Sequence, residues 1–304
     1  MELGMIGLGK MGGYMTERLI KGGHRVVGFD RDAATVQQIA GKGAQGANSL
    51  ESLVTQLKAP RVIWLMVPAG APVDSTIASL LPHLAEGDTI IDGGNSNYRD
   101  SMRRAAELKP KNINFVDVGT SGGVWGLKEG YSMMIGGDAA VVERLSPIFK
   151  TLAPGPDKGW GRIGPAGSGH FVKMVHNGIE YGMMQAYAEG LDLLAHKKEF
   201  NIDLLQVSRI WQFGSVIRSW LLDLTIDALA GNPELAGIGA HVTDSGEGRW
   251  TAIEGIELGV PLPVLSAALD VRLRSQDPEP FANKLLAMMR HEFGGHAVQS
   301  VASK

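Results

Sequence analysis

One predicted helix carries four polar side chains suited to acid–base chemistry. Lys173, His176, Asn177 and Glu180 recur at the three- and four-residue spacing that places side chains on one helix face. A neutral lysine accepts a proton, a glutamic acid donates one, and histidine and asparagine can bind a substrate by hydrogen bonds. The spacing fits equally well an amphipathic helix with its polar stripe in water and an ordinary His176–Glu180 pair. The opposite face is apolar and is expected to be buried: Val172, Val175, Ile179, Met183 and Ala186.

A glycine-rich turn near the N-terminus predicts a dinucleotide site. Residues 7–12 follow an apolar strand pattern and open a helical pattern, which is the context that a G-x-G-x-x-G motif needs. The glycines would form a tight turn, let the backbone approach pyrophosphate and pack the helix on the strand, while the helix N-terminus offers N–H groups to phosphate. The cofactor-binding residues expected here are Gly7, Leu8, Gly9, Lys10, Met11 and Gly12.

The acid that ends the next strand bears on the choice of cofactor. A carboxylate at Asp30 can accept hydrogen bonds from the ribose hydroxyls of NAD, and it repels the 2′-phosphate of NADP. Arg31 beside it has the opposite tendency, because a guanidinium can pair with that phosphate; it can also simply lie in solvent. We expect Asp30 to dominate, so that NAD is the preferred cofactor, with NADP still possible.

Two further loops follow buried strand patterns, at the edge where open parallel sheets bind ligands. They are residues 66–70 and 92–96. Ordinary turn chemistry is the alternative for both loops, with Asn95 and Ser96 capping the next helix. The loop residues assigned to the cofactor are Met66, Val67, Pro68, Ala69 and Asn95.

Two kinds of domain are needed to hold these residues. In the first half, short apolar runs alternate with helical patterns, which is typical of βαβ units and a parallel sheet. Residues 151–169 combine three prolines with six glycines and indicate the passage between two domains. Residues 168–196 keep helical periodicity without proline, and no convincing strand follows. We therefore predict an α/β protein, with a Rossmann-type dinucleotide-binding domain at residues 1–165 and an all-helical substrate and dimerisation domain at residues 166–304. The strands are expected at residues 3–8, 25–30, 61–67, 89–92, 114–118 and 132–136, and the first helices at 11–21 and 33–41.

Composition narrows the class of function. The 304 residues are 44% hydrophobic and 20% charged, which is typical of a folded globular protein. The 29 Lys and Arg are balanced by 32 Asp and Glu, so no basic field would attract nucleic acid or an anionic membrane. The absence of cysteine excludes thiolate metal sites, and we expect no metal. Because no apolar run is long enough for a membrane span and no charged leader is visible, we expect a cytoplasmic protein.

The motifs together resemble those of the decarboxylating 6-phosphogluconate dehydrogenases. They are GLGKMG from Gly7, IDGGNSNYRDSMRR from Ile91, SGG from Ser121 and GHFVKMVHNGIEYG from Gly169, and the resemblance runs nearly end to end. The chain resembles the short bacterial form, which lacks a duplicated helical half. The resemblance implies conversion of 6-phosphogluconate to ribulose 5-phosphate and carbon dioxide with reduction of NAD(P)+, a step of the pentose phosphate pathway and of gluconate utilisation.

The resemblance also implies residue roles. Lys173 matches the general base, Glu180 the general acid, and Asn95 a residue that contacts both substrate and nicotinamide. Arg290 and His296, in the segment RHEFGGH, match residues that reach the substrate of a neighbouring subunit, which implies a homodimer or homotetramer with shared tails. Without the resemblance, this segment is an ordinary basic surface tail. The other implied contacts to the sugar phosphate are Ser121, Gly122, Gly123, His176, Asn177, Tyr181 and Arg272.

One loop departs from the family pattern. Ser245 and Glu247 replace a lysine and a threonine that contact the substrate phosphate in the family. A glutamate is a poor neighbour for phosphate, which weakens the expectation that this loop binds it. Arg218 or Arg249 could compensate.

The implied chemistry suits the residue types. A desolvated, neutral Lys173 can take the C3 hydroxyl proton as hydride leaves, the resulting β-keto acid can lose carbon dioxide without a metal, and Glu180 can protonate the enediol at C1. Two alternatives remain. A β-hydroxyacid dehydrogenase acting on a small hydroxy acid or semialdehyde shares the nucleotide domain and the lysine but does not need Glu180. A non-catalytic dinucleotide sensor needs no polar stripe.

Overall fold

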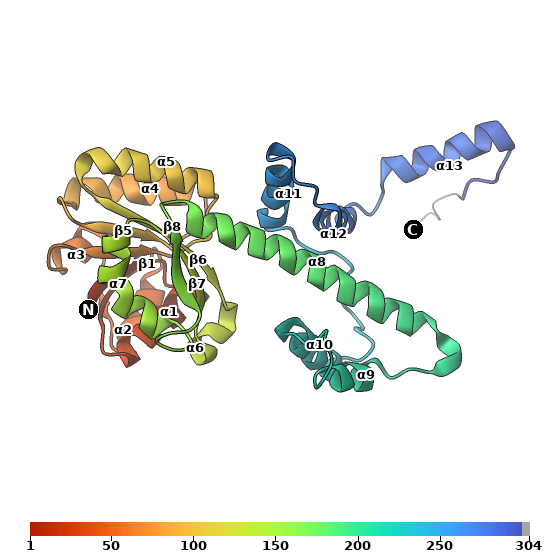
Figure 1. Cartoon of the computed structure of the whole chain (residues 1–304), viewed down its shortest axis with the longest axis horizontal. Helices are drawn as coiled ribbons and strands as arrows, with labels where there is room; N and C mark the ends of the chain where they lie inside the picture. The colour runs from red at the N-terminus through yellow and green to blue at the C-terminus, as the bar shows by residue number, and fades with distance from the viewer. Residues whose placement is uncertain (300–304) are drawn as a thin grey trace. The chain divides into compact units, whose positions relative to one another are not determined.

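The computed structural model describes residues 1–299. The chain divides into two compact units, the first comprising Met1–Asn177 and the second beginning at Gly178 (Figure 1). The division falls inside helix α8, which is continuous over Ser168–His196, so the predicted helical segment at residues 168–196 is confirmed. The domain boundary predicted at residue 165 lies just before this helix.

An eight-stranded sheet forms the centre of the first unit, with the strand order β3-β2-β1-β4-β5-β6-β7-β8. Neighbouring strands from β3 to β6 all pair in parallel. This order reverses direction between β1 and β4, which is the topological switch of a Rossmann-type sheet and confirms the predicted fold class. The strands are β1 (Glu2–Ile6), β2 (Arg25–Phe29), β3 (Gln45–Gly46), β4 (Val62–Leu65), β5 (Thr89–Asp92), β6 (Asn114–Ser121), β7 (Ser132–Gly136) and β8 (Trp160–Gly164).

Two features of the sheet differ from the prediction. Strand β7 runs antiparallel to β6, because the turn η3 (Gly123–Trp125) and the short helix α6 (Gly126–Glu129) make a connection too short for the crossover that a parallel pair needs. Strand β8 pairs in parallel with β7 and lies inside residues 151–169, the predicted interdomain passage. Its glycines hide the alternation that identifies a strand.

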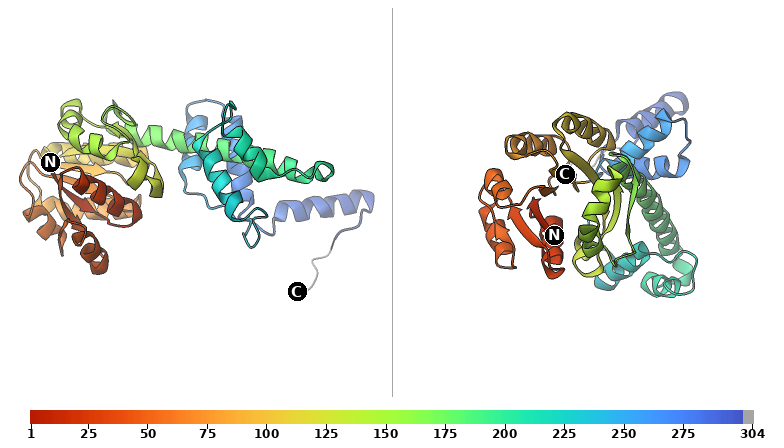
Figure 2. Two further views of the ribbon diagram at one scale, coloured as in Figure 1. Left: turned by 90° about the horizontal axis from the view of Figure 1, so that it is seen from below. Right: turned by 60° about the vertical axis from the view of Figure 1, so that its left-hand side comes forward.

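Helices cover both faces of the sheet (Figures 1 and 2). Alternate strand residues point to opposite faces, and they divide the apolar side chains into two cores. Helices α1, α2 and α7 supply the core on one face, with Trp64 and Phe149 at its centre, whereas α3, α4 and α5 supply the other. The helices of this unit are α1 (Lys10–Lys21), α2 (Ala33–Ala40), α3 (Leu50–Thr55), α4 (Ala71–Leu80), η1 (Leu81–His83), α5 (Tyr98–Leu108), η2 (Lys109–Lys111) and α7 (Ala139–Leu152).

The described part of the second unit contains helices and no strand, which confirms the all-helical prediction. One small buried cluster in it consists of Tyr181, Ala268 and Leu269, and Leu222, Ile226 and Leu229 are also buried. No helix among residues 1–299 combines the length and apolar character needed to cross a bilayer. The helices that follow α8 are η4 (Lys198–Phe200), α9 (Leu204–Trp211), α10 (Trp220–Gly231), α11 (Glu247–Glu257), α12 (Pro263–Arg274) and α13 (Phe281–Gly294).

The prediction for the two faces of α8 is wrong in the single chain. Ile179 is 51% exposed and Met183 is 39% exposed, whereas Lys173 on the polar stripe is only 5% exposed. Val172 and Val175 are half-buried, and Ala186 is exposed. Helical periodicity identifies residues that share a face, but it does not show which face meets a neighbouring element.

Candidate active site

The turn between β1 and α1 has the shape that a dinucleotide site needs. Gly7 has a φ of +88°, and a Cβ there would lie 2.4 Å from the Met66 carbonyl oxygen. A Cβ on Gly12 would lie 2.0 Å from the Gly7 carbonyl oxygen. By contrast, a Cβ on Gly9 would meet no described atom within 4 Å, and Gly9 caps α1 without a side-chain hydrogen bond. Gly7 and Gly12 therefore allow the turn and the packing, while Gly9 leaves helix N–H groups open to a phosphate.

Asp30 directly follows β2 and is tied to the glycine turn. Its Oδ2 accepts a hydrogen bond from the Leu8 N–H at 2.7 Å, and its Oδ1 accepts one from the Asp32 N–H at 3.0 Å. The side chain of Asp30 is half-buried, and Arg31 is exposed. A carboxylate oxygen can accept two hydrogen bonds, so Asp30 can hold ribose hydroxyls while the turn fixes its position. The other two turn residues are an exposed Lys10 and a half-buried Met11.

The loops that follow β4 and β5 adjoin the glycine turn. Met66 donates its N–H to the Ile6 carbonyl oxygen at 2.7 Å, and a Cβ on Gly94 would lie 2.5 Å from the Val67 carbonyl oxygen. The structure thus brings the predicted cofactor loops together at the carboxyl edge of neighbouring strands. The exposed tip of the β4 loop consists of Pro68 and Ala69.

Asn95 is clamped to strand β6. Its Nδ2 donates to the Thr120 carbonyl oxygen at 3.0 Å, and its Oδ1 accepts from the Thr120 N–H at 2.8 Å. The second amide hydrogen of Asn95 is not used in this pair. The N-cap of α5 is Asn97, whose side chain accepts from the Arg99 N–H, so the alternative in which Asn95 and Ser96 cap this helix is wrong.

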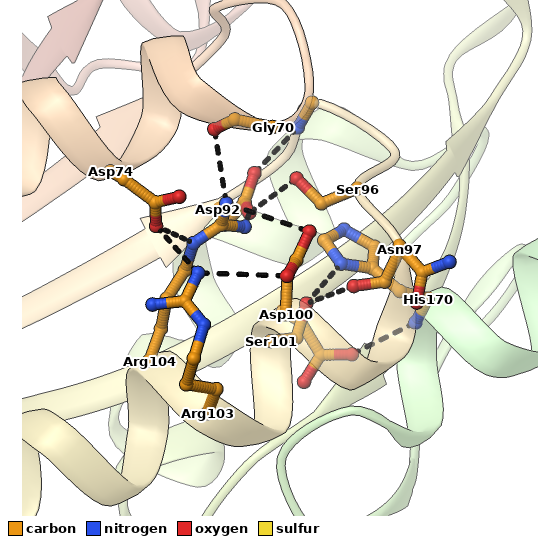
Figure 3. A network of polar contacts seen from close by, with 12 residues as sticks. Gly70, Asp74, Asp92, Ser96, Asn97, Asp100, Ser101, Arg103, Arg104 and His170 are labelled. Carbon is orange, nitrogen blue, oxygen red and sulfur yellow. Dashed lines mark hydrogen bonds and ion pairs between the residues drawn. The ribbon is translucent and has the colours of Figure 1, made fainter.

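A buried ion pair joins the β4 and β5 loops to α5 (Figure 3). Arg104 is 1% exposed and Asp92 is fully buried, and Arg104 Nη1 lies 3.2 Å from Asp92 Oδ2. The guanidinium also donates to Asp74 Oδ1 at 2.8 Å and to the Gly70 carbonyl oxygen at 3.1 Å. Asp92 accepts a further hydrogen bond from the Ser96 hydroxyl at 2.7 Å. The sequence places Asp92 at the start of a predicted ligand loop and Arg104 on the helix that follows, but nothing in these residue types shows that the two side chains meet.

Lys173 is held by its neighbours on α8. Its Nζ donates to Asn177 Oδ1 at 2.6 Å and lies 3.3 Å from His176 Nδ1. An ammonium has only donors, whereas a neutral amine can also accept a hydrogen bond from the histidine ring. An ammonium and a neutral amine can both make these two contacts, because the role of His176 Nδ1 depends on its tautomer; the contacts fix the position of Nζ and leave its protonation state open. Glu180 is half-buried and lies about two turns further along the same helix.

The end of β6 presents the predicted Ser-Gly-Gly turn. Ser121 is the last residue of the strand and is half-buried. Gly122 and Gly123 have φ values of +132° and +51°, a region that disfavours other residues. Lys173 packs against this strand two residues earlier, since a Cβ on Gly119 would lie 2.4 Å from the Lys173 Cβ. The structure therefore brings Asn95, Ser121 and Lys173 to one end of β6.

A second polar cluster lies in the second unit around Tyr181. The Tyr181 hydroxyl donates to Asp244 Oδ1 at 3.0 Å, and the Arg272 guanidinium carbon lies 3.5 Å from the Tyr181 ring centroid. Burial raises the pKa of Asp244, but hydrogen bonds from the Gly246 N–H and Tyr181 and the ion pair with Arg249 outweigh it and hold this pKa below its usual value. Tyr181 and Arg272, predicted to contact the substrate, are thus brought together.

The loop that departs from the family pattern is part of this cluster. Glu247 is 9% exposed, and its Oε2 accepts a hydrogen bond from the Ser245 hydroxyl at 3.1 Å. Arg249 Nη2 lies 2.6 Å from Asp244 Oδ2, and Arg218 is exposed. The two arginines that could replace the missing phosphate contacts therefore differ. Arg249 forms an ion pair with Asp244 of the cluster, whereas Arg218 is on the surface.

The two tail residues lie in and after α13. Arg290 and His296 are exposed, and the His296 ring contacts Phe293 edge-on at a centroid distance of 6.3 Å. Among the residues the structure describes, no group of three His, Asp or Glu side chains could hold a metal ion.

Comparison with known proteins assigns the chain to a family. Residues 2–161 match the NAD binding domain of 6-phosphogluconate dehydrogenase, and residues 169–284 match the 6-phosphogluconate dehydrogenase C-terminal domain. The NAD(+)-dependent, decarboxylating 6-phosphogluconate dehydrogenase of Haloferax volcanii is 44% identical over 98% of each chain. The chain belongs to the 6-phosphogluconate dehydrogenase family. This assignment confirms the resemblance drawn from the motifs.

Two solved structures share the fold of this chain over most or all of its length. The Plasmodium falciparum 6-phosphogluconate dehydrogenase superimposes with a TM-score of 0.84 and 30% identity, over 100% of this chain but 67% of that one. A Mycobacterium tuberculosis 3-hydroxyisobutyrate dehydrogenase superimposes with a TM-score of 0.73 and 22% identity, over 90% of this chain and 92% of that one. The second likeness shows a shared fold, which agrees with the nucleotide domain that the β-hydroxyacid dehydrogenases were expected to share.

Proposed function

We propose that this protein catalyses the oxidative decarboxylation of 6-phosphogluconate to ribulose 5-phosphate and carbon dioxide with reduction of NAD(P)+, as a step of the pentose phosphate pathway. The observation that carries the proposal is the buried Lys173 amine, hydrogen-bonded to Asn177 at 2.6 Å on the helix that also carries Glu180. A base and an acid on one helix suit a reaction with two separate proton transfers.

Lys173 acts first, as the general base. Its amine removes the C3 hydroxyl proton while the C3 hydride leaves for the dinucleotide, and Asn177 and His176 hold the amine in place. The bound dinucleotide supplies the hydride acceptor. The resulting 3-keto acid loses its carboxylate as carbon dioxide because the ketone takes up the electron pair as an enolate. Lys173, now protonated, stabilises the charge that develops on that oxygen.

Glu180 acts second, as the general acid. The enediol left by decarboxylation needs a proton at C1, and a protonated carboxyl group can deliver it. In this proposal the sugar acid is contacted by Asn95, Ser121, Gly122 and Gly123. The phosphate end is assigned to Tyr181 and Arg272, with Ser245 supplying a hydroxyl, while Glu247 accepts from Ser245 and is not assigned to phosphate.

NAD is the preferred cofactor in this proposal. The half-buried Asp30 carboxylate stands at the end of β2, held by the Leu8 N–H, where a 2′-phosphate would meet a like charge. The relative from Haloferax volcanii is named as NAD(+)-dependent, which supports the same choice. Gly9 leaves the space that pyrophosphate needs.

A second copy of the chain completes the site in this proposal. Helix α13 carries Arg290 and exposes large apolar side chains that water would not favour: Phe281, Leu285, Leu286, Met288, Met289 and Phe293. A two-fold partner that covers this helix would bring Arg290 and His296 to the substrate of the neighbouring subunit. The cytoplasmic location stays a prediction from the sequence.

Turnover with two substrates tests the proposal. Purified protein is assayed with 6-phosphogluconate and with 3-hydroxyisobutyrate, each with NAD and with NADP, and reduced dinucleotide is followed by absorbance. We expect kcat/KM for 6-phosphogluconate to exceed that for 3-hydroxyisobutyrate by at least about 10³-fold, since the charged groups at the phosphate end have no partner on the smaller acid. Comparable values would favour the β-hydroxyacid dehydrogenase alternative, and no turnover with either would favour the sensor.

A further inference from the structure

The N-terminus of α8 is capped from a distant strand. Helix α8 begins at Ser168, and Phe171 donates its N–H to the Gly167 carbonyl oxygen at 2.9 Å, so Gly167 is the N-cap. The Gly167 N–H donates to Asp117 Oδ1 at 2.6 Å, and the His170 N–H donates to Asp117 Oδ2 at 2.8 Å. These are the two N–H groups that a capping box satisfies with local side chains. Here a single carboxylate on β6 satisfies both.

Glycines let this end of the helix press against the sheet. A Cβ on Gly169 would lie 2.4 Å from the Met134 carbonyl oxygen, and a Cβ on Gly136 would lie 2.4 Å from Asp117 Oδ1. These clashes involve backbone and a fully buried carboxylate, which cannot move aside cheaply. The position of the first turn of α8 over β6 and β7 is therefore closely defined.

The same face of β6 that caps α8 also meets the catalytic lysine. Asp117, Gly119 and Ser121 alternate along β6 and so lie on one face of the strand. Asp117 caps α8, Gly119 leaves room for the Lys173 side chain, and Ser121 ends the strand at the proposed substrate site. The intervening Thr120 is the residue to which Asn95 is clamped. A shift of α8 along β6 would thus move Lys173 relative to Ser121 and Asn95.

A second contact holds the same helical turn. The His170 ring is 1% exposed, and its Nδ1 lies 2.7 Å from the Ser101 hydroxyl oxygen of α5 (Figure 3). Together with the two hydrogen bonds to Asp117, it links the start of α8 to the helix that carries Arg104. The start of the helix that carries Lys173 is therefore held by α5, the same helix that Arg104 connects to the β4 and β5 loops.

We propose that Asp117 is a positioning residue, which sets Lys173 against the substrate by capping α8 from β6. The proposal rests on the proposed function, because it gives Lys173 the role of general base. The Asp117 charge is matched by helix N–H groups and the positive end of the helix dipole. An asparagine there can accept only one of the two N–H groups and turns an N–H toward the other, so the first turn of α8 loosens while the dinucleotide loops on β1, β2 and β4 stay intact.

Asp117→Asn is compared with Asp88→Asn, a matched change at the opposite end of the sheet. Asp88 is also fully buried and accepts two backbone N–H groups, from Arg61 at 2.6 Å and Ala85 at 2.9 Å, and it forms an ion pair with the Arg61 guanidinium at 3.1 Å. We expect kcat of Asp117→Asn to fall about 10²-fold, the scale for a catalytic group misplaced by about 1 Å, with the NAD dissociation constant within about twofold of wild type. Asp88→Asn should lose a similar amount of thermal stability while keeping kcat within about twofold.

Hydrogen exchange gives a readout that does not depend on the proposed function. Amides of residues 166–176 should exchange at least about tenfold faster in Asp117→Asn than in wild type. In Asp88→Asn their exchange rates should equal those of wild type. If Asp117→Asn does not fold, Asp117→Ser carries the same test, because a hydroxyl oxygen keeps a hydrogen-bond acceptor at this position while the charge is removed. Unchanged exchange at residues 166–176, or a kcat loss that Asp88→Asn reproduces, would overturn the positioning role. Faster exchange in a protein whose wild type does not oxidise 6-phosphogluconate would overturn the proposed function and leave the capping role intact.

Discussion

The Asp30 carboxylate accepts a hydrogen bond from the Leu8 N–H at 2.7 Å. The acid proposed to select the cofactor and the turn proposed to receive its phosphates are therefore joined by a hydrogen bond, although they follow different strands. A change at Asp30 acts on both charge and turn geometry, and a test of cofactor choice has to separate the two.

Asp30→Ser should relax the preference for NAD. We expect wild-type kcat/KM to be higher with NAD than with NADP, and the NADP-to-NAD ratio to rise at least about tenfold in Asp30→Ser. Two like charges about 4 Å apart near a protein surface repel by about 4 kcal/mol, and Arg31 is then left to pair with the phosphate. Asp30→Asn is the matched control, because it keeps an acceptor for Leu8 while removing the charge. A wild-type preference for NADP would contradict this account.

Lys173→Met should abolish oxidation, because the methionine keeps the length of the side chain and removes the proton acceptor. The variant should still bind NAD with a dissociation constant within about twofold of wild type, since most of the residues proposed to bind NAD lie in the turns that follow β1, β2 and β4. Steady-state kinetics and NAD titration by tryptophan fluorescence check both expectations. Turnover above about 10% of wild type would remove Lys173 from the role of base.

Glu180→Gln should depress ribulose 5-phosphate formation by about 10²- to 10⁴-fold, the usual scale for loss of a general acid. Oxidation precedes this step, so a single turnover should still produce reduced dinucleotide. Rapid-mixing absorbance measures oxidation, and product analysis measures ribulose 5-phosphate. Near-full steady-state turnover would show that Glu180 is not the acid.

Hybrid dimers should reveal whether the tails are shared. A Lys173→Met subunit carries an intact tail and an Arg290→Ala subunit carries an intact catalytic helix, so a mixed dimer with tails acting in trans regains one complete site. We expect verified hybrids to recover up to about half of wild-type activity. The control is a hybrid of Lys173→Met with Arg209→Ala, a change at an exposed arginine of α9. Both of its subunits keep Arg290, so it measures the activity of one site with an intact catalytic helix and an intact tail. Recovery no greater than in either parent would exclude sharing.

His24 should make the first unit less stable in acid. Burial and the positive N-terminus lower the pKa of His24 below its usual value, and its Nε2 lies 2.8 Å from Thr151 Oγ1. Below about pH 6.5, His24 is protonated in the unfolded state but not yet in the folded state. The free energy of unfolding therefore decreases as the pH is lowered from about 6.5 to the pKa of His24 in the folded state. Urea denaturation of His24→Gln should show a shallower acid loss than wild type, whereas His196→Gln, at a side chain that is 74% exposed, should match wild type.

Local patterns in the sequence predicted much of the first unit. Strands β5 and β7 and helix α8 have the predicted bounds, because apolar runs ended by glycine or asparagine mark buried strands regardless of their neighbours. The direction of β7 and the existence of β8 depend on connection length and pairing, which single-segment patterns do not contain.

The candidate site was predictable only where a motif is contiguous. The glycine turn and the polar stripe of α8 stand in short segments, and the structure places the turn at the carboxyl edge of the sheet and Lys173 of the stripe beside β6. Asp117 and Arg104 were missed because their partners lie far away in sequence, at Gly167 and His170 for the former and at Gly70 and Asp74 for the latter. Buried charged residues whose partners are distant in sequence are identified only from the folded structure.

The ratio of carbon dioxide released to dinucleotide reduced tests the central claim most directly. Wild-type protein is incubated with 6-phosphogluconate labelled at C1, trapped carbon dioxide is counted, and reduced NAD is measured in the same sample. A decarboxylating dehydrogenase releases one labelled carbon dioxide for each NAD reduced, and the account predicts that ratio together with stoichiometric ribulose 5-phosphate. Reduction of NAD without labelled carbon dioxide would contradict it.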